Sequence, residues 1–129
     1  MKEAISHYHR VKEISQQEVA LVQQYHTAWN GVKKDGHFTS QELLYIGRVY
    51  TGIISESVKN LDQLALVINA FTTQMSDAKR LDIINRVATS MQKNYDDLQE
   101  FNSQNIRVSI QRSKDENDIN VVKQLYGIQ

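Results

Sequence analysis

Of the side chains that bind transition metals most readily, this chain has four histidines and no cysteine. His7 and His9 are two residues apart, so on a helix their side chains point in different directions. His26 and His37 each stand alone in the sequence. Zinc sites built on a helix typically use a histidine pair four residues apart, and no such pair is present. We predict surface histidines and no metal site.

A stretch in the first third of the chain resembles the second half of a calcium-binding EF-hand loop. Glu42 falls at position twelve of that loop and Gly36 at position six. Position one is then Gly31 and position three is Lys33, although an EF-hand needs oxygen ligands at both places. Thr39, followed three residues later by Glu42, is also the pattern of a capping box. We therefore predict a helix start here and no calcium site.

The acidic residues and the serines show no catalytic spacing. The densest acidic residues, in 96–100 and 115–118, lie in mainly hydrophilic runs, whereas a glycosidase-like pair needs one carboxyl group in an apolar pocket. No serine lies in a G-x-S-x-G motif, and no glycine-rich phosphate loop is present. We predict that the chain is not an enzyme and has no catalytic or cofactor-binding residues.

Aromatic residues are the most distinctive candidates for binding. Most of them recur at helical spacing with the aliphatic residues, which favours a place in the core because aromatic side chains bury large areas. Three candidates cluster near the end of the first predicted helix and in the loop that follows it. Loops at bundle ends often carry binding residues. We predict a protein-contact patch of Trp29, His37 and Phe38.

The charge balance narrows the range of partners. The 129-residue chain has 15 basic and 15 acidic residues, so its formal net charge is zero. A neutral domain lacks the basic surface typical of direct nucleic-acid binding. The longest apolar run, 64–71, is interrupted by Asn69 and is far shorter than the roughly 18 residues that span a membrane. We predict no direct nucleic-acid contact and no transmembrane segment in this chain.

The first predicted helix runs from Lys2 to Asn30, where apolar residues recur at steps of three and four. Gly31 is a natural place for that helix to stop. Asp35 and Gly36 then favour a turn, because glycine tolerates positive φ.

A second helix is predicted to begin after Thr39. The polar stretch 55–60 leaves two alternatives open: Ser57 or Asn60 caps a new helix, or one continuous helix runs from 40 to 72. Gly47 and Gly52 lie on this helix. Each costs roughly 1 kcal/mol relative to alanine in an exposed helix interior, so we expect a close helix crossing at both.

Ser76 is the clearest helix cap in the chain. The helix predicted after it, 77–112, is about 54 Å long at 1.5 Å per residue. Asn102 and Asn105 fall near its apolar stripe, and we expect the bundle to thin there and this helix to project alone. A short segment then ends at Gly127, a residue type common just after helices. The apolar stripe of the long helix includes Leu81, Ile84, Ala88, Met91, Tyr95 and Leu98.

The chain contains no proline and only five glycines, so little in it forces a helix to stop. The predicted fold is all-α: an elongated antiparallel bundle of three main helices, with the middle one continuous or broken, plus a short C-terminal helical segment. Residues 1–129 are predicted to form a single helical-bundle domain.

Several segments resemble the TraI-type transfer proteins of Bacteroidetes conjugative transposons, which are distinct from the relaxase of the same name. They are 49–53, 56–62, 71–81, 111–118 and 122–127. These segments are structural signatures, so the resemblance assigns no functional residue. Members of the family begin with a signal peptide and an additional helical stretch. The resemblance therefore implies the C-terminal portion of a longer exported protein, located in the periplasm or at the cell surface.

The implied function is that of a non-enzymatic structural or adhesion component of a mating-pair-formation apparatus, a type IV secretion system. Its partners would be other subunits of that apparatus, contacted through helix surfaces. Two alternatives come from other classes of protein. One is a cytoplasmic helical adaptor or coiled-coil regulator, and the other is a helical small-molecule carrier with a pocket in the bundle core.

Overall fold

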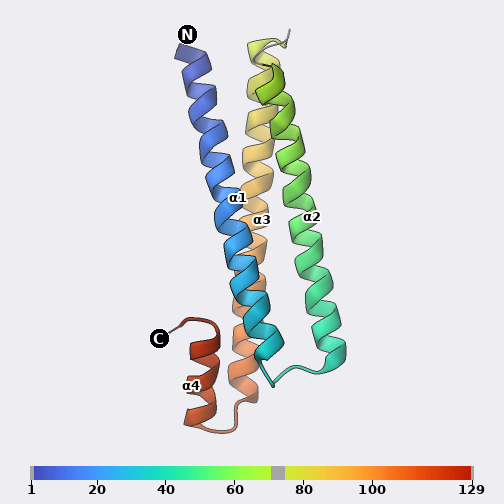
Figure 1. Ribbon diagram of the computed structural model, residues 1–129, viewed down its shortest axis with the longest axis vertical. Helices are drawn as coiled ribbons and strands as arrows, with labels where there is room; N and C mark the ends of the chain where they lie inside the picture. Colours follow the sequence, from blue (N-terminus) through green and yellow to red (C-terminus); the bar gives the residue numbers. More distant parts are fainter. Residues whose placement is uncertain (1, 71–74, 129) are drawn as a thin grey trace.

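The computed structural model describes residues 2–70 and 75–128, which form four helices and no strand (Figure 1). The helices are α1 (Lys2–Lys34), α2 (Ser40–Ala70), α3 (Asp77–Arg112) and α4 (Glu116–Leu125). The three long helices lie side by side, with α2 antiparallel to α1 and α3. The short α4 packs beside the C-terminal ends of α1 and α3. The predicted all-α, elongated bundle of three main helices with a short C-terminal segment is confirmed.

All three long helices contribute to one apolar core. The periodic stripe predicted for α3 is largely correct, since Ile84, Met91 and Leu98 are completely or almost completely buried. Leu81, at the start of that stripe, is instead 42% exposed. The other large, fully buried apolar side chains are Leu21, Val32, Tyr50, Leu64, Val67 and Val122.

The helix starts follow the predicted capping chemistry. The backbone N–H of Glu42 donates to Thr39 Oγ1 at 3.1 Å, and the backbone N–H of Thr39 donates to Glu42 Oε1 at 2.9 Å. This is a complete capping box. Ser76 caps α3 by accepting from the backbone N–H of Lys79 at 3.2 Å. Gly127, with a φ of 67°, follows α4 as predicted.

The prediction that α1 ends at Gly31 is wrong, because α1 continues to Lys34. Gly31 has a packing role instead. A Cβ atom at this position would lie only 2.9 Å from the ring of Tyr126 and 3.0 Å from the carbonyl oxygen of Leu125. The absence of a side chain therefore lets the C-terminal end of α4 approach the backbone of α1.

The middle helix is continuous from Ser40 to Ala70, so neither Ser57 nor Asn60 starts a new helix. Their polar side chains instead form hydrogen bonds across the bundle. Ser57 Oγ donates to Glu18 Oε1 of α1 at 3.0 Å, and Asn60 Nδ2 donates to Ser90 Oγ of α3 at 3.0 Å. The predicted continuation of this helix over 71 and 72 lies outside the described residues.

The expectation that α3 projects alone beyond Asn102 is also wrong. Asn105 is only 8% exposed and Ser109 is fully buried. Asn102 accepts a hydrogen bond from the hydroxyl of Tyr50 at 2.6 Å. The asparagines are therefore part of the bundle interior. Among the described residues, no helix has both the length and the apolar character needed to cross a membrane.

Candidate functional site

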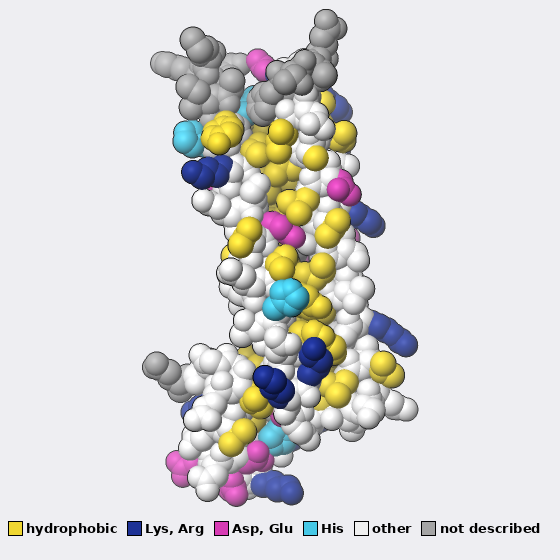
Figure 2. All heavy atoms as spheres, viewed as in Figure 1, with side chains coloured by type: hydrophobic (Ala, Val, Ile, Leu, Met, Phe, Trp, Pro, Cys, Tyr) yellow, Lys and Arg dark blue, Asp and Glu magenta, His cyan; other side chains and the backbone are white. Residues whose placement is uncertain are grey.

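An apolar groove runs between α1 and α2, with a volume of about 770 Å³. Figure 2 shows hydrophobic side chains gathered in a column along this face of the bundle. We call it the α1–α2 groove. Its α1 wall is Tyr25, Trp29 and Lys33, and its α2 wall extends from Ser40 to Thr51 and includes Leu43, Leu44, Gly47 and Arg48.

Trp29 is held in place at the centre of this groove. A Cβ atom at Gly47 would lie 3.3 Å from the Trp29 indole, so glycine lets the ring approach the backbone of α2 closely. The ring also packs edge-on against buried Tyr50, with 5.7 Å between centroids. Lys33 Nζ lies over the ring, 5.4 Å from its centroid, within the range of a cation–π contact. The indole is therefore a preorganised apolar surface.

The rim of the groove is basic. Lys33 of α1 and Arg48 of α2 line it, and neither forms an ion pair among the described residues. Leu44 also lines the groove and is 64% exposed. An exposed leucine together with two cations that have no carboxylate partner is a surface that recognises apolar and acidic groups.

A second candidate site lies at the end of the bundle, around the buried carboxylate of Asp35. This residue is only 3% exposed. Its Oδ2 atom accepts from the hydroxyls of Ser109 at 2.5 Å and Tyr126 at 2.8 Å. Its Oδ1 atom lies 2.6 Å from His37 Nδ1 and accepts from the His37 backbone N–H at 3.1 Å. Asp35 thus ties the α1–α2 loop to α3 and to the end of α4.

His37 lies between two carboxylates. Its Nδ1 atom faces Asp35, and its Nε2 atom lies 2.9 Å from Asp118 Oδ2. A carboxylate beside each ring nitrogen favours the form of His37 in which both nitrogens carry a proton, the imidazolium ion. The hydrogen bonds to Asp118 and Asp35 raise the pKa of His37 above its usual value.

Ser109, His37 and Asp35 together have the residue types of a hydrolase triad, but their arrangement is different. In a triad, one imidazole nitrogen faces the aspartate and the other accepts the serine proton. Here Ser109 Oγ lies 3.2 Å from the same Nδ1 atom that Asp35 contacts, and Asp118 occupies the Nε2 side. Neither nitrogen is free to act as a base, and Ser109 is fully buried. The arrangement is suited to holding α4 and the loop in place.

Arg112 covers this cluster from α3. Its guanidinium forms two hydrogen bonds to Glu42, at 2.7 and 2.8 Å, and a third to the His37 carbonyl oxygen at 2.9 Å. The hydrogen bonds from Arg112 lower the pKa of Glu42 to about 2. The guanidinium also lies 5.9 Å from the ring of Phe38. The capping box of α2 is therefore fixed to the end of α3.

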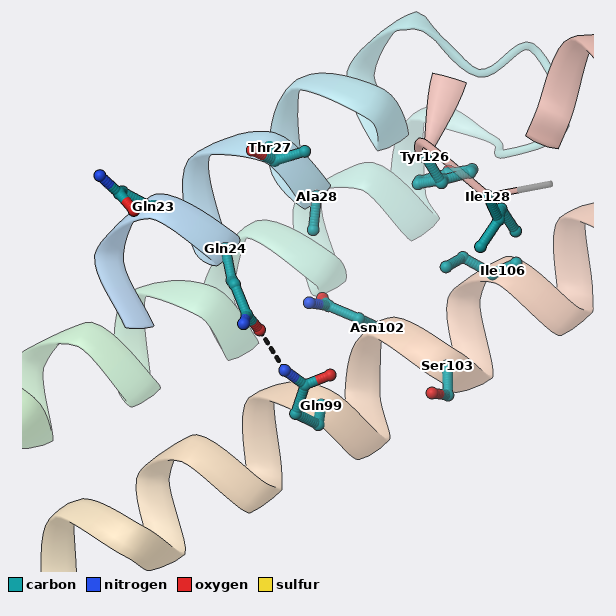
Figure 3. Close-up of a pocket in the computed structure, with 10 residues that line it drawn as sticks. All are labelled: Gln23, Gln24, Thr27, Ala28, Gln99, Asn102, Ser103, Ile106, Tyr126 and Ile128. Atoms are coloured by element: carbon teal, nitrogen blue, oxygen red, sulfur yellow. Dashed lines mark hydrogen bonds between the residues drawn. The ribbon is translucent and has the colours of Figure 1, made fainter. Parts of the chain in front are cut away.

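A third hollow, of about 530 Å³, lies between α1, α3 and the end of α4 (Figure 3). Its polar lining is mainly amide groups, and a hydrogen bond between Gln99 and Gln24 crosses it. Gln24 Nε2 also donates to the Tyr95 hydroxyl at 2.8 Å. Asn102 accepts from Tyr50, so much of the polar lining already has a partner within the chain.

The structure divides the predicted contact patch between two places. Trp29 lines the α1–α2 groove, whereas His37 belongs to the Asp35 cluster and Phe38 is half-buried beneath Arg112. The prediction that all histidines lie on the surface is wrong for His37, and also for His7, which is 6% exposed. His37 is drawn inward by its two carboxylate partners.

Sequence reasoning missed the Asp35 cluster as a whole. Its members lie as far as 91 positions apart, and no local spacing connects them. One signal was available: in an antiparallel bundle, the loop containing Asp35 and His37 lies beside the end of the third helix, where Ser109 interrupts the apolar stripe. In the part of the chain that the structure describes, no group of three or more histidine or acidic side chains is placed to hold a metal ion.

Comparisons with known proteins give no relatives for this chain. No family model, no curated protein and no solved structure matches it.

Proposed function

We propose that this chain is a non-enzymatic interaction module that works through its helix surfaces. The observation that carries this proposal is the α1–α2 groove, which presents a fixed indole, an exposed leucine and two unpaired cations on one face. Exposed apolar surface bordered by polar residues is typical of protein-interaction sites. The Asp35 cluster supports a structural role, since both nitrogens of its histidine already face carboxylates.

We further propose that the module is a structural or adhesion component of a conjugative mating-pair-formation apparatus, at the cell surface or in the periplasm. The support for this finer assignment is the resemblance of five sequence segments to TraI-type transfer proteins. A rigid helical rod with a lateral groove is compatible with a subunit that contacts other exported subunits.

The small-molecule carrier is the less favoured alternative. A carrier would need an enclosed apolar volume with convergent polar groups. The hollows in the described part of the chain are open to solvent, and the polar one at Gln24 and Gln99 is largely occupied by its own hydrogen bonds.

Site-specific photo-crosslinking in mating donor cells tests the proposal. A photo-reactive residue at Leu44 reports on the groove, and one at Leu66, which is also exposed on α2, is the matched control. We expect crosslinks from position 44, and not from 66, to other subunits of the transfer apparatus. Recovery of only cytoplasmic partners would favour the adaptor and refute the secretion assignment.

A further inference from the structure

We infer that the α1–α2 groove binds one amphipathic helix from another protein, with large apolar side chains on its inner face and carboxylates beside them. This inference deepens the proposed function by naming the chemistry of the partner. The groove has the length of a short helix, a fixed floor and a basic rim.

The dimensions match a short helix. The lining residues extend from Tyr25 to Lys33 on α1 and from Ser40 to Thr51 on α2. At 1.5 Å per residue these spans are about 12 and 16 Å, or two to three helical turns. A helix of that length presents its apolar side chains at positions i, i+3 or i+4, and i+7. These side chains can pack against Trp29, Leu43 and Leu44.

The floor of the groove is rigid enough to select a shape. Trp29 contacts Gly47, Tyr50 and Lys33, which restrain its ring. Binding therefore costs little ordering of this side chain, and a preorganised aromatic group is a typical centre of binding energy.

The rim requires acidic partner residues. Lys33 and Arg48 have no carboxylate partner among the described residues, whereas Lys93 and Arg112, for example, are paired within the chain. One cation comes from each wall of the groove. The antiparallel pairing of Trp29 with Gly47 places Lys33 beside about position 43 of α2, so the two cations are offset by about 7.5 Å along the axis. Carboxylates four residues apart on a bound helix have a similar offset, of about 6 Å.

A second copy of this chain is a poor occupant. In a two-fold symmetric dimer the two grooves would face each other, which would bring Lys33 and Arg48 of both copies together without a counter-charge. The α4 helix is not free to fill the groove either, because Val122 is fully buried and Tyr126 is hydrogen-bonded to Asp35.

Peptide binding to the purified chain tests the inference. Trp29 is the only tryptophan, so its fluorescence reports on the groove directly. The probe is a synthetic helical peptide of about 14 residues, with leucines at i, i+4 and i+7 and glutamates flanking them. A second peptide has lysines in place of the glutamates. We expect saturable binding of the acidic peptide, with the basic peptide weaker by about tenfold or more.

Charge reversal and a matched apolar pair make the test specific. The Lys33→Glu/Arg48→Glu double variant should invert the preference between the two peptides. Leu44→Gln should weaken binding of the acidic peptide by about tenfold, whereas Leu66→Gln should leave it within about twofold. All four positions are exposed on helix surfaces, so we expect each variant to fold. Circular dichroism verifies this.

Three outcomes overturn the inference. They are no saturable change in Trp29 fluorescence, equal binding of both peptides, and concentration-dependent dimerisation in sedimentation experiments that Leu44→Gln abolishes. The last outcome would assign the groove to a second copy. Binding of the acidic peptide combined with crosslinks to unrelated proteins in cells would retain the groove chemistry and reject only the conjugative apparatus.

Discussion

A carboxylate faces each ring nitrogen of His37, and both contacts favour its positively charged form. The same contacts act on those carboxylates. Hydrogen bonds from the Lys114 backbone and from His37 lower the pKa of Asp118. Burial alone would raise the pKa of Asp35, but hydrogen bonds from Ser109, Tyr126 and His37 outweigh it, and the net shift is downward. Protonated His37 therefore stabilises both carboxylates at the end of the bundle, and each carboxylate stabilises the charge on His37.

These shifts predict a pH window for stability. A raised histidine pKa contributes stability that is complete below the unfolded value, about 6.5, and is lost as the pH rises through the folded value. Lowered aspartate pKa values contribute stability that is complete above about 4 and is lost as the pH falls through the folded values. The Asp35 cluster should therefore contribute most between about pH 4 and 6.5, and urea unfolding at about pH 5.5 and 8.5 measures the difference.

The His37→Gln variant should have a lower unfolding free energy than the wild type at about pH 5.5. Between about pH 5.5 and 8.5, its unfolding free energy should decrease much less than that of the wild type. The His26→Gln variant is the control for the loss of any histidine, because His26 is exposed and lies outside the cluster. An unchanged pH dependence in His37→Gln would show that the imidazolium and its carboxylates do not stabilise the fold.

At the scale of single helices, the sequence correctly predicted the helix starts that are set by neighbouring residues. The starts of α2 and α3 follow from Thr39, Glu42 and Ser76, whose capping partners lie within three residues. The end of α1 could not be predicted in this way. Gly31 has the residue type of a helix stop, but its role depends on Tyr126, which lies 95 positions away in the sequence and beside it in space.

The two α2 glycines show the same limit. Gly47 does provide a close approach, for the ring of Trp29, whereas a Cβ atom at Gly52 would meet nothing within 4 Å. The sequence spacing of the two glycines gave no means of distinguishing them, because the difference lies on the neighbouring helix.

Alanine substitutions at Gly31 and Gly52 should therefore have opposite effects. Gly52→Ala should raise the unfolding free energy by about 0.5–1 kcal/mol, because alanine has the higher helix propensity and the site is open. Gly31→Ala should loosen α4, since its Cβ atom would collide with the Tyr126 ring and the Leu125 carbonyl oxygen. Amide hydrogen exchange should then accelerate in α4 more than in α2. Equal protection of α4 in Gly31→Ala and wild type would show that the contact is not needed.

Across the whole molecule, polar hydrogen bonds join the long helices at several levels of the bundle. Glu18 of α1 contacts Ser57 of α2, Asn60 of α2 contacts Ser90 of α3, and Gln17 of α1 contacts Gln92 of α3. Of these residues, the sequence singled out only Ser57 and Asn60, as possible caps of a new helix. The Glu18–Ser57 bond is buried, the Asn60–Ser90 bond is partly buried and the Gln17–Gln92 bond is exposed. Buried polar pairs favour one alignment of the helices over its alternatives, generally at some cost in stability.

Glu18 is where that cost should be measurable. Glu18 is only 7% exposed, and its Oε2 atom is buried without a hydrogen-bond partner. Burial raises the pKa of Glu18, so the folded state holds the proton more tightly than the unfolded chain does. Stability from this residue is therefore greatest below the unfolded pKa of about 4.5 and decreases as the pH rises through the folded value.

The double variant Glu18→Leu/Ser57→Ala should consequently raise the unfolding free energy at about pH 7, by about 1–3 kcal/mol, because an apolar pair replaces a buried carboxylate. The gain should shrink at about pH 4, where the wild-type carboxyl is neutral. Glu13→Leu, at an exposed position on the same helix, should change stability by less than about 0.5 kcal/mol. Chemical denaturation at both pH values provides the measurement. A double variant less stable than wild type at neutral pH would mean that the Glu18–Ser57 contact contributes net stability, and that the helices depend on it for more than alignment.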